Sequence, residues 1–143
     1  MKAKFIIAGI AGFLISFLSG FVAHGILLRG EYATIPNLMR TEADAMNYLP
    51  HMLLSHLFKG FAFAWVYQQG ISGRPWFAQG IRYGFAMIFL ITVPLYLVYF
   101  AVQPMPGTLV ALQIVADSIS TILMGVVVAF ICKSGQTEKA LGN

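Results

Sequence analysis

The sequence predicts an all-α integral membrane protein, a bundle of four transmembrane helices with both termini in the cytoplasm. Hydrophobic residues make up 59% of the 143-residue chain, mean hydropathy is +0.79 and charged residues account for 10%. Ordinary soluble domains contain roughly 45–50% apolar residues, so a soluble fold is excluded. The length leaves room for one membrane domain over residues 1–143.

Four segments are long enough to cross a bilayer core about 30 Å thick, which needs roughly 20 helical residues. The second segment carries His51, His56 and Lys59 and is therefore the weakest span. The first follows Lys2 and Lys4, as in a signal peptide, but exceeds the roughly 7–15 apolar residues of one, so we expect an uncleaved anchor. The spans are Phe5 to Leu28, Leu49 to Gln69, Gln79 to Val102 and Thr108 to Cys132.

The distribution of lysine and arginine predicts the orientation, because cytoplasmic flanks retain positive charge. With four spans, one side receives Lys2, Lys4, Arg74, Arg82, Lys133 and Lys139. The other side receives the external loop 29–48, in which acidic residues balance Arg29 and Arg40, and the uncharged turn 103–107. We therefore expect a protein of the bacterial inner membrane. The net charge of +4 is scattered over the ends of apolar runs, which does not indicate nucleic-acid binding.

Three local signals concern helix ends and bends. Thr41, followed by Glu42 and Asp44, predicts a short helix within the external loop. Pro50 suits the first turn of the second span, where its missing N–H is tolerated. Pro94 lies inside the third span and predicts a distortion of that helix.

Small residues recur at intervals of four in every span, a pattern typical of close helix packing in lipid. In the first span the pattern suggests a face that associates with a second copy or with a larger membrane complex, besides the lipid bilayer itself. That face consists of Ala8, Gly12, Ser16 and Gly20. The other spans carry Gly60 and Ala64, Gly80 and Gly84, and Thr121, Gly125 and Ala129.

Lys59 and Asp117 are ionisable residues near the middle of the second and fourth spans. A charge at this depth costs about 2.5–3.5 kcal/mol on insertion scales, so each side chain needs a partner. Both lie about ten residues from the outer end of their spans, and we predict that they pair. The three histidines, His24, His51 and His56, fall in the same outer half. These five residues form the predicted polar cluster.

Three interpretations of the polar cluster remain open from the sequence. The cluster is a structural salt bridge with anchoring histidines, a proton or ion pathway, or a haem site that uses His24 with His51 or His56. The spacing of His51 and His56 turns them about 140° apart on one helix, so they do not share a small metal ion. We expect no metal site, and the sequence favours a protein without a cofactor.

The sequence gives little support to catalysis. The single cysteine, Cys132, excludes an internal disulfide and any Cys-x-x-Cys motif. No nucleophile with a base beside it is evident, and the first span has no acid, whereas small multidrug transporters depend on a glutamate there. We therefore expect a non-enzymatic accessory subunit or a transport-related protein, with a proton-conducting, ion-conducting or haem-binding protein as the alternative.

Overall fold

The computed structural model describes residues 2–133, and this part of the chain is helical, with no strand. Lys139, one of the predicted topology signals, lies outside the described residues. The elements are α1 (Lys2–Gly20), the π-helix η1 (Phe21–Leu27), α2 (Arg29–Tyr32), the 3-10 helix η2 (Pro36–Leu38), α3 (Glu42–Asn47), α4 (Leu49–Gln69), α5 (Trp76–Met87), the π-helix η3 (Ile88–Thr92), α6 (Val93–Val102) and α7 (Gly107–Cys132).

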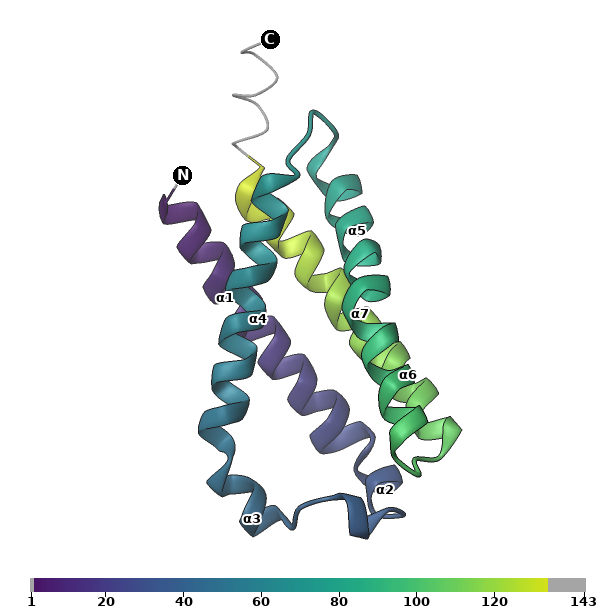
Figure 1. Cartoon of the computed structure of the whole chain (residues 1–143). Helices are drawn as coiled ribbons and strands as arrows, with labels where there is room; N and C mark the ends of the chain where they lie inside the picture. Colours follow the sequence, from purple (N-terminus) through teal and green to yellow (C-terminus); the bar gives the residue numbers. More distant parts are fainter. Residues whose placement is uncertain (1, 134–143) are drawn as a thin grey trace.

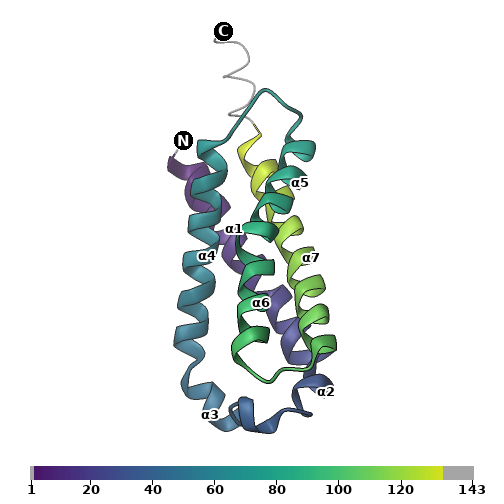
Figure 2. The same cartoon turned by 45° about the vertical axis from the view of Figure 1, so that its right-hand side comes forward.

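The long helices form four rods, which are α1 with η1, α4, α5 with η3 and α6, and α7 (Figures 1 and 2). One end of the molecule holds the start of α1, the α4–α5 loop and the end of α7; we call it the loop end. The opposite end holds α2, α3 and the α6–α7 turn, and we call it the α2/α3 end. Residues 29–48 therefore lie far from the α4–α5 loop.

Three helical stretches of the described chain are long and apolar enough to cross a membrane. They are Lys2–Leu27, Trp76–Val102 and Gly107–Cys132, of 26, 27 and 26 residues. They correspond to the first, third and fourth predicted spans, so the class of membrane protein is supported. The fourth rod, α4, has the expected bounds but is too polar to be counted with them.

The small-residue face of α1 packs against α4 inside the chain. A Cβ added to Gly60 of α4 would lie 2.3 Å from the Phe13 nitrogen and 2.6 Å from the Gly9 oxygen. Gly12 lies against the Gly60 backbone, and Ser16 is 2% exposed. Predicting close packing for this face was right. In this structure α4 covers much of the face, and association with a second copy or a larger membrane complex through it stays a prediction.

Glycines also set the contact between α5 and α7. A Cβ on Gly125 would lie 2.5 Å from the Gly80 oxygen, and a Cβ on Gly84 would lie 2.8 Å from the Ile122 Cα. Both distances are to backbone atoms, which no side-chain rotation relieves. The predicted spacing of small residues in the third and fourth spans thus marks a real interface.

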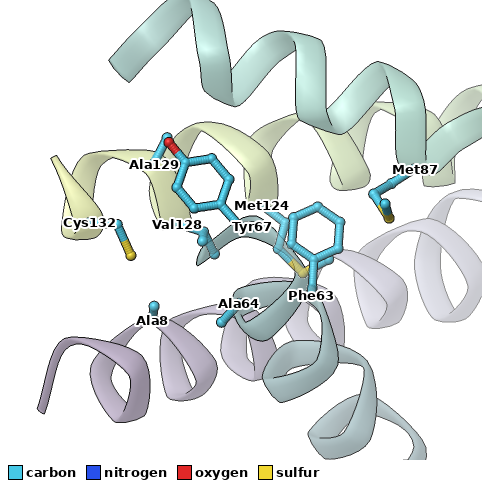
Figure 3. Packing of buried hydrophobic residues seen from close by; sticks show 9 residues of the cluster. All are labelled: Ala8, Phe63, Ala64, Tyr67, Met87, Met124, Val128, Ala129 and Cys132. Atoms are coloured by element: carbon cyan, nitrogen blue, oxygen red, sulfur yellow. The ribbon is translucent and has the colours of Figure 1, made fainter. Parts of the chain in front are cut away.

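A compact apolar cluster fills the bundle toward the loop end. Its residues come from α1, α4, α5 and α7, and Figure 3 shows their side chains meeting between these helices. Phe63 and Tyr67 of α4 contribute the largest side chains, and Tyr83 packs on both rings. The cluster consists of Ala8, Phe63, Ala64, Tyr67, Met87, Met124, Val128, Ala129 and Cys132.

The local helix signals are found where the sequence places them. The Thr41 side chain caps α3 by accepting a hydrogen bond of 3.3 Å from the Asp44 N–H. Pro50 occupies the first turn of α4. The distortion ahead of Pro94 takes the form of η3, in which the Val93 N–H bonds the Ile88 carbonyl five residues earlier. The wider turn relieves the collision between the proline ring and the preceding turn.

Candidate functional site

Asp117 of α7 is the centre of the polar network near the α2/α3 end. Its Oδ1 accepts a hydrogen bond from His24 Nε2 at 3.1 Å, and its Oδ2 accepts one from the Tyr96 hydroxyl at 2.7 Å. The His24 and Asp117 side chains are 29% and 20% exposed. One carboxylate therefore joins η1, α6 and α7, the three rods that are apolar enough to span a membrane.

Tyr32 and Gln113 extend this network toward the loop of residues 29–48. The Tyr32 hydroxyl lies 2.6 Å from His24 Nδ1 and accepts a hydrogen bond of 2.8 Å from Gln113 Nε2. Burial raises the pKa of the Tyr32 hydroxyl, and the nearby Asp117 charge adds to the increase, so this phenol stays protonated at physiological pH. Gln113 is 4% exposed, and its Oε1 has no hydrogen-bond partner among the described residues.

Both π-helices help to position side chains of the Asp117 network. His24 lies within η1, whose wide last turn is closed by the bond from the Leu28 N–H to the Ala23 carbonyl. Tyr96 follows η3 by four residues, so the extra residue of that π-helix sets the direction of its side chain. π-helical turns inside α-helices occur frequently at functional sites. One π-helix contains His24 and the other precedes Tyr96, which marks this location independently of the polar residues.

A second tier of polar contacts lies between the Asp117 network and the apolar cluster. Ser19 and Ser120 join α1 to α7 through a hydrogen bond of 2.5 Å. Thr121 donates to the Asp117 carbonyl at 2.7 Å and lies 3.5 Å from the Thr92 hydroxyl. These groups are small, buried or half-buried, and mutually satisfied. They therefore continue the network as packing contacts that need no ligand.

The predicted pair of Lys59 and Asp117 is wrong. Asp117 uses its two oxygens on His24 and Tyr96, and Lys59 makes no ion pair or hydrogen bond with a described residue. The reason is lateral placement, because α4 packs chiefly on α1 whereas α7 packs on α1 and α5. The contact between α4 and α7 is small and lies toward the apolar cluster, so equal depth along the two helices does not bring Lys59 onto Asp117.

The other two predicted site residues lie apart from Asp117. His56 Nδ1 bonds the Ser16 hydroxyl, and its ring fills the space that Gly20 leaves open, where a Cβ would lie 3.3 Å from the ring. His51 is exposed and stacks loosely on Tyr48, with ring centroids 5.8 Å apart. Of the five predicted residues, the structure brings only His24 and Asp117 into contact.

The described residues do not fit a metal or haem site at this network. No group of three His, Cys, Asp or Glu side chains is placed to hold a metal ion within residues 2–133. Both ring nitrogens of His24 already have protein partners, and His56 faces Ser16.

Sequence reasoning missed Tyr32, Tyr96 and Gln113. Each is an uncharged polar residue, and single tyrosines near predicted boundaries are explained equally well by anchoring at the interface. The signal in the sequence that points to such residues is the depth of Asp117. A carboxylate inside the membrane needs hydrogen-bond donors on neighbouring helices. Comparison of the chain with protein-family models, curated proteins and solved structures finds no match.

Proposed function

We propose that this chain is a four-span protein of the bacterial inner membrane type with both termini in the cytoplasm. The 21 residues of α4 span about 30 Å at 1.5 Å each, the thickness of a bilayer core. The placement of Lys4, Arg74, Arg82 and Lys133 at the loop end supports a cytoplasmic position for that end. The α2/α3 end then faces outward.

We further propose that the protein is a non-enzymatic accessory or transport-related subunit that binds a proton reversibly at His24. The observation that carries this proposal is the direction of the hydrogen bonds. A carboxylate only accepts, so His24 Nε2 carries the proton of its bond to Asp117. In neutral His24 the Nδ1 atom then accepts from Tyr32, which in turn accepts from Gln113.

Protonation of His24 reverses the donor and acceptor roles in part of this series of hydrogen bonds. Imidazolium donates from both nitrogens, so Nδ1–H donates to the Tyr32 oxygen and the Tyr32 O–H needs a new acceptor. The unpartnered Oε1 of Gln113 supplies one when its amide turns over. The added positive charge faces the Asp117 carboxylate. Two hydrogen-bond arrangements thus differ by one proton and by the orientation of Tyr32, which is the residue that connects α2 to the bundle.

Several charged and titratable groups surround His24. Asp117 faces it from α7, Tyr32 from α2 and, through the carboxylate, Tyr96 from α6. From α4, the charges of His56 and Lys59 act on this network across a longer distance.

The position of the apolar cluster favours exchange of protons with one end of the bundle only. Phe63, Tyr67, Met124 and Val128 are each 4% exposed or less and fill the bundle between the polar network and the loop end. This layer is built mainly from apolar side chains and lies on the loop-end side of the Asp117 network. The site therefore supports sensing or coupling of external protons better than continuous conduction.

A spin label on α2 tests the proposal. With Ala33→Cys labelled in a Cys132→Ala background in nanodiscs, we expect two spectral components whose ratio changes between about pH 5 and 8. His24→Gln is expected to remove the change, because the protonated group is gone. His51→Gln replaces an exposed histidine and should leave the change intact. A pH response that persists in His24→Gln, or disappears in His51→Gln, contradicts the assignment.

A further inference from the structure

A second polar site lies at the loop end, far from His24. An open pocket of about 270 Å³ lies between the end of α4 and the start of α5. The figures show the α4–α5 loop at the opposite end of the bundle from α2 and α3 (Figures 1 and 2). The pocket is lined in part by Ser72, Arg74 and Arg82. Neither the predicted polar cluster nor the proton-binding proposal uses these residues.

The walls of this pocket are fixed by buried hydrogen bonds. Gln79 is 8% exposed, donates to the Gly70 carbonyl at 2.9 Å and accepts from the Ser72 N–H at 3.3 Å. Tyr83 donates to the Phe63 carbonyl at 2.7 Å. Gln79 thereby holds the α4–α5 loop onto α5, and Tyr83 holds α5 onto α4. These hydrogen bonds fix the walls of the pocket without using Arg74 or Arg82.

The arginines of the pocket differ from those of the α2/α3 end in their partners. Arg29 pairs with Glu42, and Arg40 pairs with Asp44 at 2.7 Å. Arg74 and Arg82 are exposed and make no ion pair or hydrogen bond with any residue in 2–133. All four acidic residues of that range belong to the outer loop or to the Asp117 network. The pocket is therefore lined by two arginines that have no carboxylate partner in the described structure.

We propose that this pocket binds a phosphate group, carried either on an anionic phospholipid or on a soluble phosphate compound. The guanidinium fork matches the oxygens of a phosphate and forms paired hydrogen bonds with it. The Ser72 hydroxyl donates to Gln79 Oε1 at 3.4 Å, so it belongs to the hydrogen bonds that hold the rim. Pockets for whole drug-sized ligands measure about 300–1,000 Å³, so a smaller open pocket suits a headgroup while the rest of the molecule stays outside.

The test compares two double variants of the full chain that lose the same charge. Arg74→Gln with Arg82→Gln removes the pocket arginines, and Arg29→Gln with Arg40→Gln removes the outer pair. In nanodiscs of phosphatidylcholine with a minor share of phosphatidylglycerol, native mass spectrometry counts the phosphatidylglycerol retained. We expect retention on the order of tenfold weaker in the pocket variant only. Equal loss in both variants, or no loss in either, excludes the phospholipid headgroup as the source of the phosphate.

A second arm separates the two sources of phosphate. Phosphorus NMR of inorganic phosphate, with the protein in pure phosphatidylcholine nanodiscs, is expected to show line broadening that the pocket variant lacks. Broadening without selective retention of phosphatidylglycerol assigns the pocket to a soluble phosphate compound. Retention without broadening assigns it to the lipid headgroup. Absence of both in the unaltered protein overturns the proposal, while circular dichroism verifies that the variants are folded.

Discussion

Gly60→Ala is expected to separate α1 from α4 and to destabilise the protein by about 1–3 kcal/mol or more, as overpacking does. The new methyl group would meet the Phe13 nitrogen at 2.3 Å and the Gly9 oxygen at 2.6 Å. Both atoms belong to the α1 backbone, so only a shift of a whole helix relieves the contact. Gly125→Ala is expected to act in the same way between α5 and α7, where the Gly80 oxygen lies 2.5 Å away.

The matched control for these variants is Gly30→Ala. Gly30 lies in α2, is exposed and has no heavy atom within 4 Å of an added Cβ. Because alanine favours helix over glycine by about 1 kcal/mol, this change should be neutral or slightly stabilising. Thermal unfolding in detergent measures all three variants. Stabilities of Gly60→Ala and Gly125→Ala equal to that of the control would show that the helices do not approach so closely.

Asp117→Asn is expected to lower stability by about 1–2 kcal/mol and to abolish the pH response of the spin label on α2. Asparagine has the shape of aspartate, but its single oxygen satisfies only one of the two donors, His24 and Tyr96. Hydrogen bonds between helices in membranes contribute about 0.6 kcal/mol on average and up to about 1.7 kcal/mol. Loss of the charge also leaves the imidazolium without its counter-ion, which removes the reason for protonation there.

Asp44→Asn is the control for this prediction. Asp44 pairs with Arg40 on the surface of the external loop, and exposed pairs of this spacing contribute about 0.3–0.5 kcal/mol. The same exchange of carboxylate for amide should therefore have little effect there. The charge-reversed double variant, Lys59→Asp with Asp117→Lys, should not recover the stability lost by either change. Recovery of stability in the double variant would show that Lys59 and Asp117 do pair, as the sequence alone suggested.

The parts of the fold predicted from sequence are those that depend on local periodicity. Long apolar runs predict the three membrane-crossing stretches, and Thr41 and Pro50 predict the starts of α3 and α4, because capping is decided within one helical turn. The spacing of Gly60 and Gly125 likewise predicts close packing. The partner of each packing face was not predictable, since small-residue spacing says how close a neighbour comes but not which helix it is.

The candidate site was predictable only in part, for a related reason. The need for a partner at Asp117 follows from its depth, and His24 was among the residues proposed. The pairing with Lys59 used depth alone, whereas contact also requires adjacent helices and the correct face. The faces of His24 and Tyr96 depend on η1 and η3, each of which departs from the regular turn of an α-helix. A helical repeat of 3.6 residues therefore does not predict the direction in which these side chains point.

The most direct test of a proton site at His24 is nitrogen NMR of the labelled imidazoles in nanodiscs, with His24 assigned through His24→Gln. We expect His24 to carry its proton on Nε2 at high pH and to gain a second proton on Nδ1 when the sample is acidified from about pH 8 to about pH 5. The Nδ1 resonance of that form should shift in Tyr32→Phe, which lacks the hydroxyl next to this atom. A His24 that keeps one protonation state throughout this range, or a resonance unaffected by Tyr32→Phe, would contradict the account.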